Sequence, residues 1–530
     1  MYIASVPNRS SPPAILLRES YRRDGKVRSR TLANLSHWAP ARIDALRRAL
    51  RGEFDHRSSP PACGPVFGLL FALKQLADSL GITSALGKSS PAKLALFLVL
   101  ARVAHQGSRL SAVRWARNHA VEEVLGLGKF DEDDLYAALD DLCARQEAIE
   151  KALYRRHVER RGAPPSLLLY DVTSSYLEGE HNALAEYGYN RDGKRGKLQI
   201  VIGLLTDDEG EPLAVRVFAG NTGDPATVAE QIRILKDQFA VEELVFVGDR
   251  GMVKSKGKQA LHAEGLRYIG ALTDPQIRKL LSTGTLQMSL FAEQVCEVEA
   301  DGVRYVLRKN PDEAARERHR WEDKLTKLRQ KVERRNEQVS KSQRCQPDAG
   351  LRQLELWVAR HKLTGQVALR VDGRAIALEL HHAAIDQAMR LAGCYVVVTD
   401  VAKPRMTPQA VHDNYMNLQK VERDFRLMKT GLLEVRPVFV RNQSRTRGHV
   451  LCCLLALKLS REIERRLHAA FGNTSTGLHV VTVADALAAL SRLCLLEYPI
   501  QGPHRVTCLP TPDPRQQEIL AALQLSLPKK

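Results

Sequence analysis

Apolar residues recur at spacings of three and four from residue 66 to residue 160, a period typical of amphipathic helices. The pattern is interrupted at four glycines, Gly81, Gly87, Gly107 and Gly128. We therefore expect a helical domain over residues 61–160. Its segments 91–106 and 110–119 predict two helices joined by a turn, with basic residues gathered at Arg109, Arg114, Arg117 and His119. A helix-turn-helix that binds DNA ends and a purely structural bundle explain this arrangement equally well.

The first sixty residues show a different pattern, that of a β-hairpin. From Ala14 to Ser36 polar and apolar positions alternate around Asp24-Gly25, a dipeptide that favours the tight turn of a β-hairpin. Five Arg and Lys residues lie between Arg22 and Arg30. Contact with a DNA backbone and plain solvation of surface charge are both consistent with them. We expect residues 1–60 to form a basic hairpin region.

The period changes to that of strands after Ser166. The runs LLLYDV, LQIVIGLLTD and EPLAVRVFAG predict three consecutive strands. A helix over 225–239, a strand ELVFVGDRG, a helix over about 256–264 and a strand YIGALT follow. This order is that of the ribonuclease-H-like fold, an α/β fold with a mixed sheet flanked by helices, although other mixed sheets share such runs.

The strand and helix pattern is interrupted from residue 275 to residue 391. Hairpin turns are predicted at Asp301-Gly302 and Asp372-Gly373, and a long charged helix from Asp312 to Ser342. The apolar seam of that helix suits a coiled-coil contact and consists of Trp321, Leu325, Leu328 and Val332. Its charges suit a solvated face or DNA contact. We expect an insertion domain here, between two parts of a catalytic domain at 161–274 and 392–470, with a C-terminal region at 471–530.

Size and charge narrow the class of protein. A chain of 530 residues should form several domains. The 79 Lys and Arg residues outnumber the 61 Asp and Glu residues, and the net charge of +18 favours polyanionic partners, though a basic surface without such a partner gives the same totals. There is no long uncharged apolar run and no secretory signal pattern, so we expect no membrane span. Nine scattered cysteines without a C-x-x-C pair predict reduced thiols and a cytoplasmic location.

Two aspartates follow predicted buried strands. Asp171 comes after LLLY and Asp249 after LVFVG, so both are expected at the carboxyl ends of strands, where open α/β sheets bind ligands. On neighbouring strands they would repel each other unless a cation lay between them, and Mg²⁺ or Mn²⁺ suits that position. Either aspartate alone is more often structural. Asp224, in AGNTGD, is expected to cap a helix, with a role in the site as the alternative.

A third carboxylate, Glu422, lies in a predicted long helix from Pro408 to Leu433. Five residues share one side of this helix: Tyr415, Leu418, Glu422, Arg426 and Lys429. The neighbouring apolar stripe consists of Val421, Phe425, Met428 and Leu432. Packing through that stripe would direct Glu422 towards the two aspartates. An exposed amphipathic helix with incidental charges has the same pattern.

The spacing of Tyr415, Glu422 and Lys429 resembles the Tyr–Arg–Glu–Lys signature of DDE insertion-sequence transposases that carry a β-rich insertion. Leu418 stands where the signature has Arg, so Arg423 and Arg426 become the candidates for the corresponding phosphate contact. Four further blocks are similar to this superfamily: YDVTSSYLEG, AGNTGD, VGDRGM and LEVRPVFVRNQSRTRGHVLCCLLALKL. The resemblance covers about residues 165–465.

The resemblance implies that Asp171, Asp249 and Glu422 bind Mg²⁺ or Mn²⁺, as two ions. It also implies that Tyr415 and Lys429 contact DNA phosphates near the cut. Such a protein binds the terminal inverted repeats of double-stranded DNA as a homodimer at the nucleoid, and cleaves and transfers strands. The alternatives are a ribonuclease-H-like nuclease that joins no strands and a catalytically inactive DNA-binding derivative. We expect His449 to be a core residue.

Overall fold

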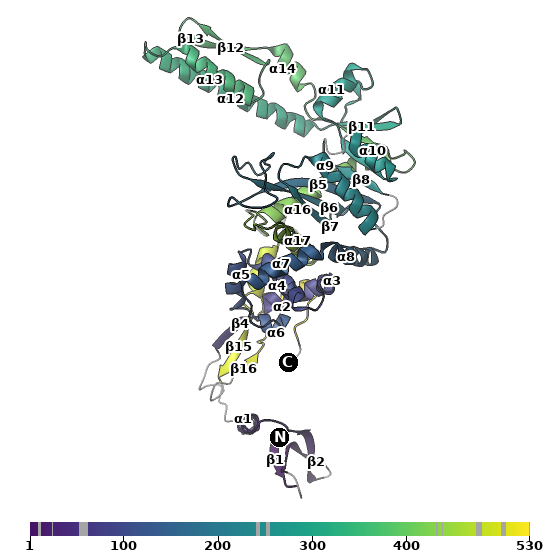
Figure 1. Cartoon of the computed structure of the whole chain (residues 1–530), viewed down its shortest axis with the longest axis vertical. Coiled ribbons are helices and arrows are strands. Elements are labelled where there is room, and N and C mark those ends of the chain that lie inside the picture. The colour runs from purple at the N-terminus through teal and green to yellow at the C-terminus, as the bar shows by residue number, and fades with distance from the viewer. Residues whose placement is uncertain are drawn as a thin grey trace.

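The structure is a computed structural model that describes residues 1–8, 12–23, 25–51, 62–239, 244–250, 255–430, 433–436, 438–472, 480–499 and 505–528. The molecule is elongated (Figure 1), with a small N-terminal sheet at one end and a helical arm at the other. Asp24 and Leu432, which the sequence places in a turn and in an apolar stripe, lie outside the described residues. No helix in the described part of the chain is long and apolar enough to cross a membrane.

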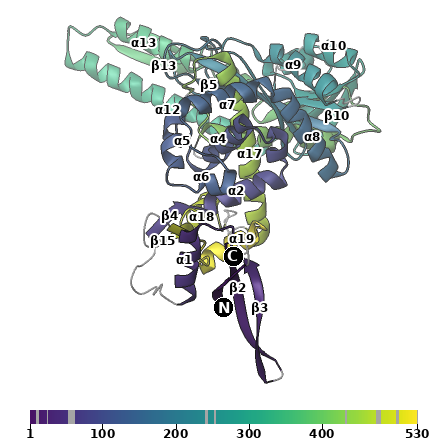
Figure 2. The same ribbon diagram turned by 60° about the horizontal axis from the view of Figure 1, so that its bottom comes forward.

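The N-terminal sheet contains the predicted hairpin. Strands β2 (Ala14–Arg23) and β3 (Lys26–Asn34) pair antiparallel, and Gly25 takes the positive φ of +72° that the turn requires. A strand that the sequence did not predict, β1 (Tyr2–Val6), pairs with β2. The hairpin projects from the body of the molecule (Figure 2), and helix α1 (Pro40–Leu50) follows it.

Residues 66–160, whose apolar period predicts helices, are largely helical in the structure. The helices are α2 (Gly68–Ser79), α3 (Ile82–Leu86), α4 (Ser90–Ala104), α5 (Arg109–Ala116), α6 (Val121–Leu125), α7 (Glu132–Ala144) and α8 (Gln146–Arg161). Helix α4 is buried on nearly all sides because its positions are almost wholly apolar. Arg109, at the start of α5, is buried as well. A central α4 with a buried Arg109 favours the structural bundle over a helix-turn-helix on DNA.

An eight-stranded sheet forms the centre of the molecule, in the order β10-β11-β14-β9-β8-β5-β6-β7. Strands β5 (Leu167–Tyr176), β6 (Gln199–Asp207) and β7 (Pro212–Ala219) form the predicted antiparallel meander. On its other edge β5 pairs parallel with β8 (Val245–Gly248), which pairs parallel with β9 (Arg267–Ala271). The expected mixed α/β sheet is therefore present, and β5 and β8 are neighbours.

Asp171 does not end its strand. β5 continues to Tyr176 because its pairing with β6 runs that far, up to Tyr176 opposite Gln199. The pairing with β8 stops at Tyr170 opposite Gly248. Asp171 and Asp249 therefore each follow the last parallel pair, at the point where β5 and β8 separate.

The predicted insertion of residues 275–391 is too wide. After α11 (Asp274–Ser282) and the short 3-10 helix η2 (Met288–Leu290), strands β10 (Cys296–Ala300) and β11 (Val303–Lys309) join the central sheet through β14 (Cys394–Thr399). Alternation along a hairpin shows that one face is buried but not which sheet it extends. The arm itself consists of α12 (Pro311–Lys341), α13 (Pro347–Arg360), β12 (Val367–Asp372), β13 (Ala375–Leu380) and α14 (His382–Met389).

The seam of α12 packs within the arm. Leu325, Leu328 and Val332 share a separate core with α13 and the β12–β13 hairpin, and Trp321 packs at its margin. The seam predicted for a coiled coil is thus covered by the chain itself, because α12 and α13 pack side by side.

Helices cover both faces of the sheet. Successive residues of β5 point to opposite faces, and the apolar residues on each face pack against different helices. Leu168 and Tyr170 pack in the core that contains α9 (Asp224–Arg233) with its π-helical continuation η1 (Ile234–Gln238), and α10 (Ser255–Ala263). Leu167 and Leu169 pack in the larger core on the other face. That core contains α15 (Pro408–Met416), α16 (Leu418–Lys429), α17 (Gln443–Phe471) and the helical domain.

The long helix predicted for Pro408 to Leu433 is broken. α15 ends at Met416, α16 begins at Leu418, and α16 ends at Lys429. Asn417 between them closes a tight turn in which its carbonyl accepts from the Lys420 N–H. Asn favours turns and caps over helix interiors. Tyr415 and Glu422 consequently lie on different helices.

The C-terminal region returns to the helical domain. It contains α18 (Val483–Leu490), β15 (Cys494–Pro499), β16 (Arg505–Cys508) and α19 (Pro514–Ala522). β15 pairs antiparallel with β4 (Ala62–Val66), and α18 and α19 pack against α17.

Candidate active site

One cavity of about 370 Å³ brings the three predicted carboxylates together. It lies where β5, β8 and α16 meet. Its polar lining residues are Asp171, Thr173, Arg191, Asp192, Asp224, Asp249, Glu422, Arg426, Lys429, Thr430 and Arg436. Glu422 faces the cavity, whereas Val421 and Met428 of the predicted apolar stripe are buried and do not line it. Phe425 is buried as well, but it forms part of the cavity wall.

Asp171 is the most enclosed of the three carboxylates. One carboxylate oxygen accepts the N–H of Val172 at 2.7 Å. Burial raises the pKa of Asp171 to about 7, and the negative charges of Asp249 and Glu422 add to the rise. Asp171 is therefore close enough to Asp249 and Glu422 for their charges to act on it. In the described part of the chain, however, no three His, Cys, Asp or Glu side chains converge tightly enough to hold one metal ion.

Tyr415 contacts Asp249 directly. Its hydroxyl donates to a carboxylate oxygen of Asp249 at 3.2 Å. Burial and the adjacent Asp249 carboxylate raise the pKa of Tyr415 well above its ordinary value, so the hydroxyl stays protonated as a donor. The tyrosine reaches the site from α15, at the side of the carboxylates.

Lys429 lies in a buried ion cluster with two partners. The carboxylate of Asp192 accepts from Lys429 Nζ at 2.8 Å and from Arg436 Nη1 at 2.6 Å. It also accepts the backbone N–H of Tyr176 at 3.1 Å. We call Asp192, Lys429 and Arg436 the Asp192 cluster. Only 1% of the Asp192 side chain and 10% of the Lys429 side chain are exposed, so the cluster joins the end of α16 to the β5–β6 connection.

Asp224 has a different partner from the one predicted. The residue that precedes α9 is Gly223, and no side chain caps the helix. Asp224 is the first helical residue, and its carboxylate accepts from Arg191 Nη2 at 2.6 Å. The expected cap is therefore wrong, because the carboxylate turns towards the arginine on the cavity wall.

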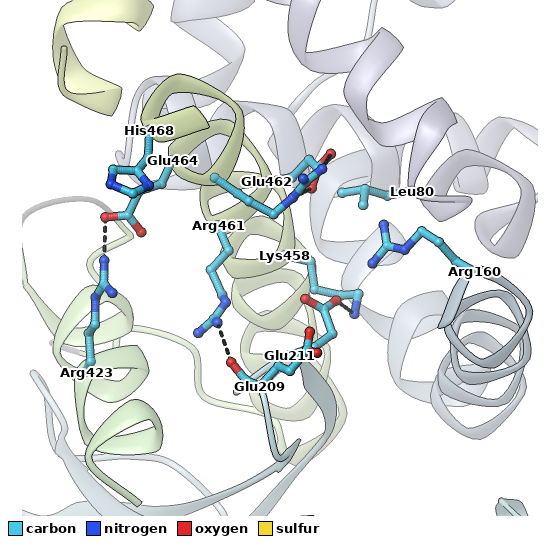
Figure 3. A pocket seen from close by; sticks show the side chains of 11 residues that line it. Leu80, Arg160, Glu209, Glu211, Arg423, Lys458, Arg461, Glu462, Glu464 and His468 are labelled. Carbon is cyan, nitrogen blue, oxygen red and sulfur yellow. Dashed lines mark hydrogen bonds and ion pairs between the residues drawn. The ribbon is translucent and has the colours of Figure 1, made fainter. Parts of the chain in front are cut away.

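The two candidate arginines, Arg423 and Arg426, point into different cavities. Arg426 is exposed and lines the cavity with the three carboxylates. Arg423 points into a second cavity of about 470 Å³ between α16 and α17, where it pairs with Glu464 (Figure 3). Leu418 is only 7% exposed and packs in the core, so it offers no contact to a phosphate. Among the three positions, Arg426 alone is available beside the carboxylates.

Three charged residues of the cavity were missed from the sequence: Arg191, Asp192 and Arg436. Arg191 and Asp192 lie just before Gly193, in a segment that looks like an ordinary polar turn. The Asp-Gly pair signals a turn, and nothing local signals that its carboxylate is buried under α16. His449 is a core residue, as expected: it is buried, Arg109 lies 3.3 Å from its Nδ1, and burial lowers its pKa.

Comparison with known proteins gives a family match at the N-terminus. Residues 3–62 match the family model of the IS1634 family transposase, N-terminal domain. The chain is also similar to piggyBac transposase in a cryo-EM structure of its synaptic complex with hairpin DNA. That likeness has a TM-score of 0.37 at 10% identity and covers 80% of this chain and 76% of that chain, which is too weak to establish a common fold. A search of curated proteins found no match to the chain.

Proposed function

We propose that this protein is a DDE transposase of a bacterial insertion sequence, which cleaves DNA at the ends of its element and transfers the freed strands. The observation that carries the proposal is the single cavity lined by Asp171, Asp249 and Glu422. Their origins agree with a ribonuclease-H-like catalytic domain, because two come from adjacent parallel strands beside an antiparallel meander. The N-terminal match and the net charge of +18 support the same function.

The oxygen donors of this cavity are of the type that hard divalent cations prefer, although the described residues do not converge on a single ion position. Three carboxylates face a common space, and the pKa of Asp171 is raised by burial and, to a lesser extent, by the negative charges of Asp249 and Glu422. Asp171, Asp249 and Glu422 would hold one or two Mg²⁺ or Mn²⁺ ions. Metal ions held by these residues would supply the charge needed to activate an attacking water or 3′-hydroxyl and to stabilise the departing oxygen.

The residues around the three carboxylates would bind DNA or orient the metal ligands. Arg426 offers an exposed guanidinium to a phosphate beside the carboxylates. Tyr415 fixes the orientation of the Asp249 carboxylate through its hydroxyl. Lys429 positions Glu422 through the Asp192 cluster rather than acting as a free phosphate ligand, because its ammonium is already paired and buried. Two copies of the chain would be needed to hold the two ends of one element.

The triad is tested by strand cleavage. Asp171→Asn should abolish nicking of end-sequence DNA by the purified protein in Mg²⁺ while DNA binding is retained. The matched control is Asp301→Asn, an aspartate in an exposed turn of the β10–β11 hairpin, which should nick normally. Nicking by Asp171→Asn at the wild-type rate would refute the assignment.

Two further measurements separate the alternatives. A nuclease without strand transfer would nick but give no product joined to target DNA. A catalytically inactive derivative would show no heat of binding when Mn²⁺ is titrated into the wild type by calorimetry, whereas the proposed enzyme should bind it and lose that heat in Glu422→Gln.

A further inference from the structure

The connection between β5 and β6, residues 177–198, carries two highly exposed tyrosines. Tyr187 is 69% exposed and Tyr189 is 82% exposed. Large aromatic side chains gain most from burial, and those held in water commonly mark a binding surface. The two tyrosines flank Gly188 in the sequence.

The backbone that carries these tyrosines is fixed. A Cβ on Gly188 would lie 2.2 Å from the carbonyl oxygen of Gly220, so the two glycines allow a close backbone approach. The buried Gln199 side chain donates to the carbonyls of Gly220 at 2.8 Å and Tyr189 at 3.2 Å. Glu186 and Gln199 also exchange both backbone hydrogen bonds. The exposure of Tyr189 is therefore imposed by an ordered loop.

Tyr189 is linked to the edge of the active-site cavity by Arg191. The guanidinium carbon of Arg191 lies 5.7 Å from the centre of the Tyr189 ring. The guanidinium of Arg191 also donates to the carboxylate of Asp224, and Arg191 and Asp224 both line the cavity. The Arg191 N–H donates to Ser174 on β5 at 2.8 Å, which holds this part of the loop against the strand that carries Asp171.

The half of the connection that carries the ring is basic, whereas residues 177–186 contain three acidic residues, Glu178, Glu180 and Glu186. Residues 187–197 contain four cationic side chains, Arg191, Lys194, Arg195 and Lys197, and one acidic residue, Asp192. The Asp192 carboxylate is buried and paired with Lys429 and Arg436. Lys194 and Arg195 are exposed. An exposed aromatic ring among cations beside a phosphodiester-cleaving site is complementary to a nucleotide with an accessible base face.

We propose that Tyr189 stacks on an unpaired nucleobase of the DNA strand that enters the cavity, while the neighbouring cations contact its phosphates. The inference rests on the proposed function and names the form of DNA that the site takes: a strand whose bases are separated from their partners near the cut. Stacking on one tyrosine face requires such a base, because a base within a duplex is already stacked on both sides.

The test uses the full chain and a thymidine oligonucleotide of about 16 residues that contains one 2-aminopurine, whose fluorescence falls on stacking. EDTA in the buffer prevents cleavage. The wild type should quench the fluorescence. Tyr189→Ala should lose the quenching and bind roughly tenfold more weakly, whereas Tyr189→Phe and Tyr189→Trp should retain both. The matched control is Tyr2→Ala, an exposed tyrosine on the N-terminal sheet at the far end of the molecule (Figure 1), which should behave like wild type.

The outcomes separate this inference from the proposed function. Quenching and affinity of Tyr189→Ala equal to wild type, or the absence of any quenching by the wild type, would overturn the stacking role. Asp171→Asn should quench normally although it does not nick. A wild type that quenches but never nicks in Mg²⁺ would refute the transposase and leave the stacking surface intact. Circular dichroism checks that each variant is folded.

Discussion

At the scale of single residues, neighbouring positions on one helix have unrelated roles. Glu422 and Arg426 face the cavity, Arg423 pairs with Glu464 in a second cavity, and Leu418 is buried. A sequence signature counts positions, whereas the direction of each side chain decides what it can touch. The absence of the signature arginine at Leu418 therefore removes no contact that this position could make here.

Arg426 and Arg423 form a matched pair for testing phosphate contact. Arg426→Ala should weaken binding to duplex DNA and reduce the slope of log affinity against log salt by about 1, because one phosphate contact is lost. Arg423→Ala should leave both quantities unchanged, because its guanidinium is occupied by Glu464. Fluorescence anisotropy at several salt concentrations measures both. Equal losses in the two variants would contradict the assignment of Arg426.

At the scale of elements, charged side chains join helices to the sheet at its edges. The Asp192 cluster ties α16 to the β5–β6 connection. Asp207, at the end of β6, links the sheet to α8, because its carboxylate accepts from His157 at 2.9 Å and from Arg161 at 3.1 Å. The same carboxylate accepts the Glu211 N–H at 2.7 Å. These contacts position the rigid elements from which the cavity is built.

Asp207 should make stability depend on pH. Burial alone would raise its pKa, but the hydrogen bonds from His157 and the Glu211 N–H outweigh burial, and the pKa lies below its ordinary value. A lowered folded-state pKa gives stability that is present above the unfolded pKa, about 4, and is lost as pH falls through the folded value. Asp207→Asn should therefore be less stable than wild type at pH 7, by about 1–3 kcal/mol, and the difference should shrink below about pH 4.

Urea unfolding between pH 3 and pH 7 measures this difference. Asp44→Asn serves as the control, because Asp44 is an exposed residue on α1 and should show little change at any pH. A gap between Asp207→Asn and wild type that stays constant down to pH 3 would contradict the lowered pKa.

At the scale of the whole molecule, the body and the arm are stabilised separately. The helical domain, α16, α17 and one face of the sheet share a single core. Close contact within it is shown by Gly448 of α17, where a Cβ would lie 2.0 Å from the carbonyl oxygen of Leu139 on α7. The arm has its own core around Leu328, and it extends away from the sheet in Figure 1. The body should therefore respond as one unit, and the arm independently.

Truncation in each core tests this division. Leu328→Ala removes a fully buried side chain and should destabilise the arm by about 2–5 kcal/mol. Amide exchange measured by mass spectrometry should then rise in residues 311–389 and stay unchanged in β5 and β8. Leu169→Ala, in the shared core, should raise exchange across the body and spare the arm. Rises that spread from Leu328→Ala into β5 would show that arm and body are coupled.

The sequence by itself determined the elements whose pattern is local. Its periods of two and of three to four located the hairpin, the helical bundle, the meander and α12. They also singled out Asp171 and Asp249 next to apolar strand residues and Glu422 next to an apolar helix stripe, although Asp171 lies within β5 and not after it. Hydrophobic period reports which side of an element is buried, and it does so within a few residues of sequence.

Only the tertiary structure decided which surfaces meet. It assigned the β10–β11 hairpin to the central sheet, broke the helix at Asn417, and paired Lys429 with Asp192 across 237 positions of sequence. It also placed the exposed Tyr189 beside Arg191 at the cavity. These outcomes depend on contacts between distant segments, whose distances and charges leave no periodic trace in the chain.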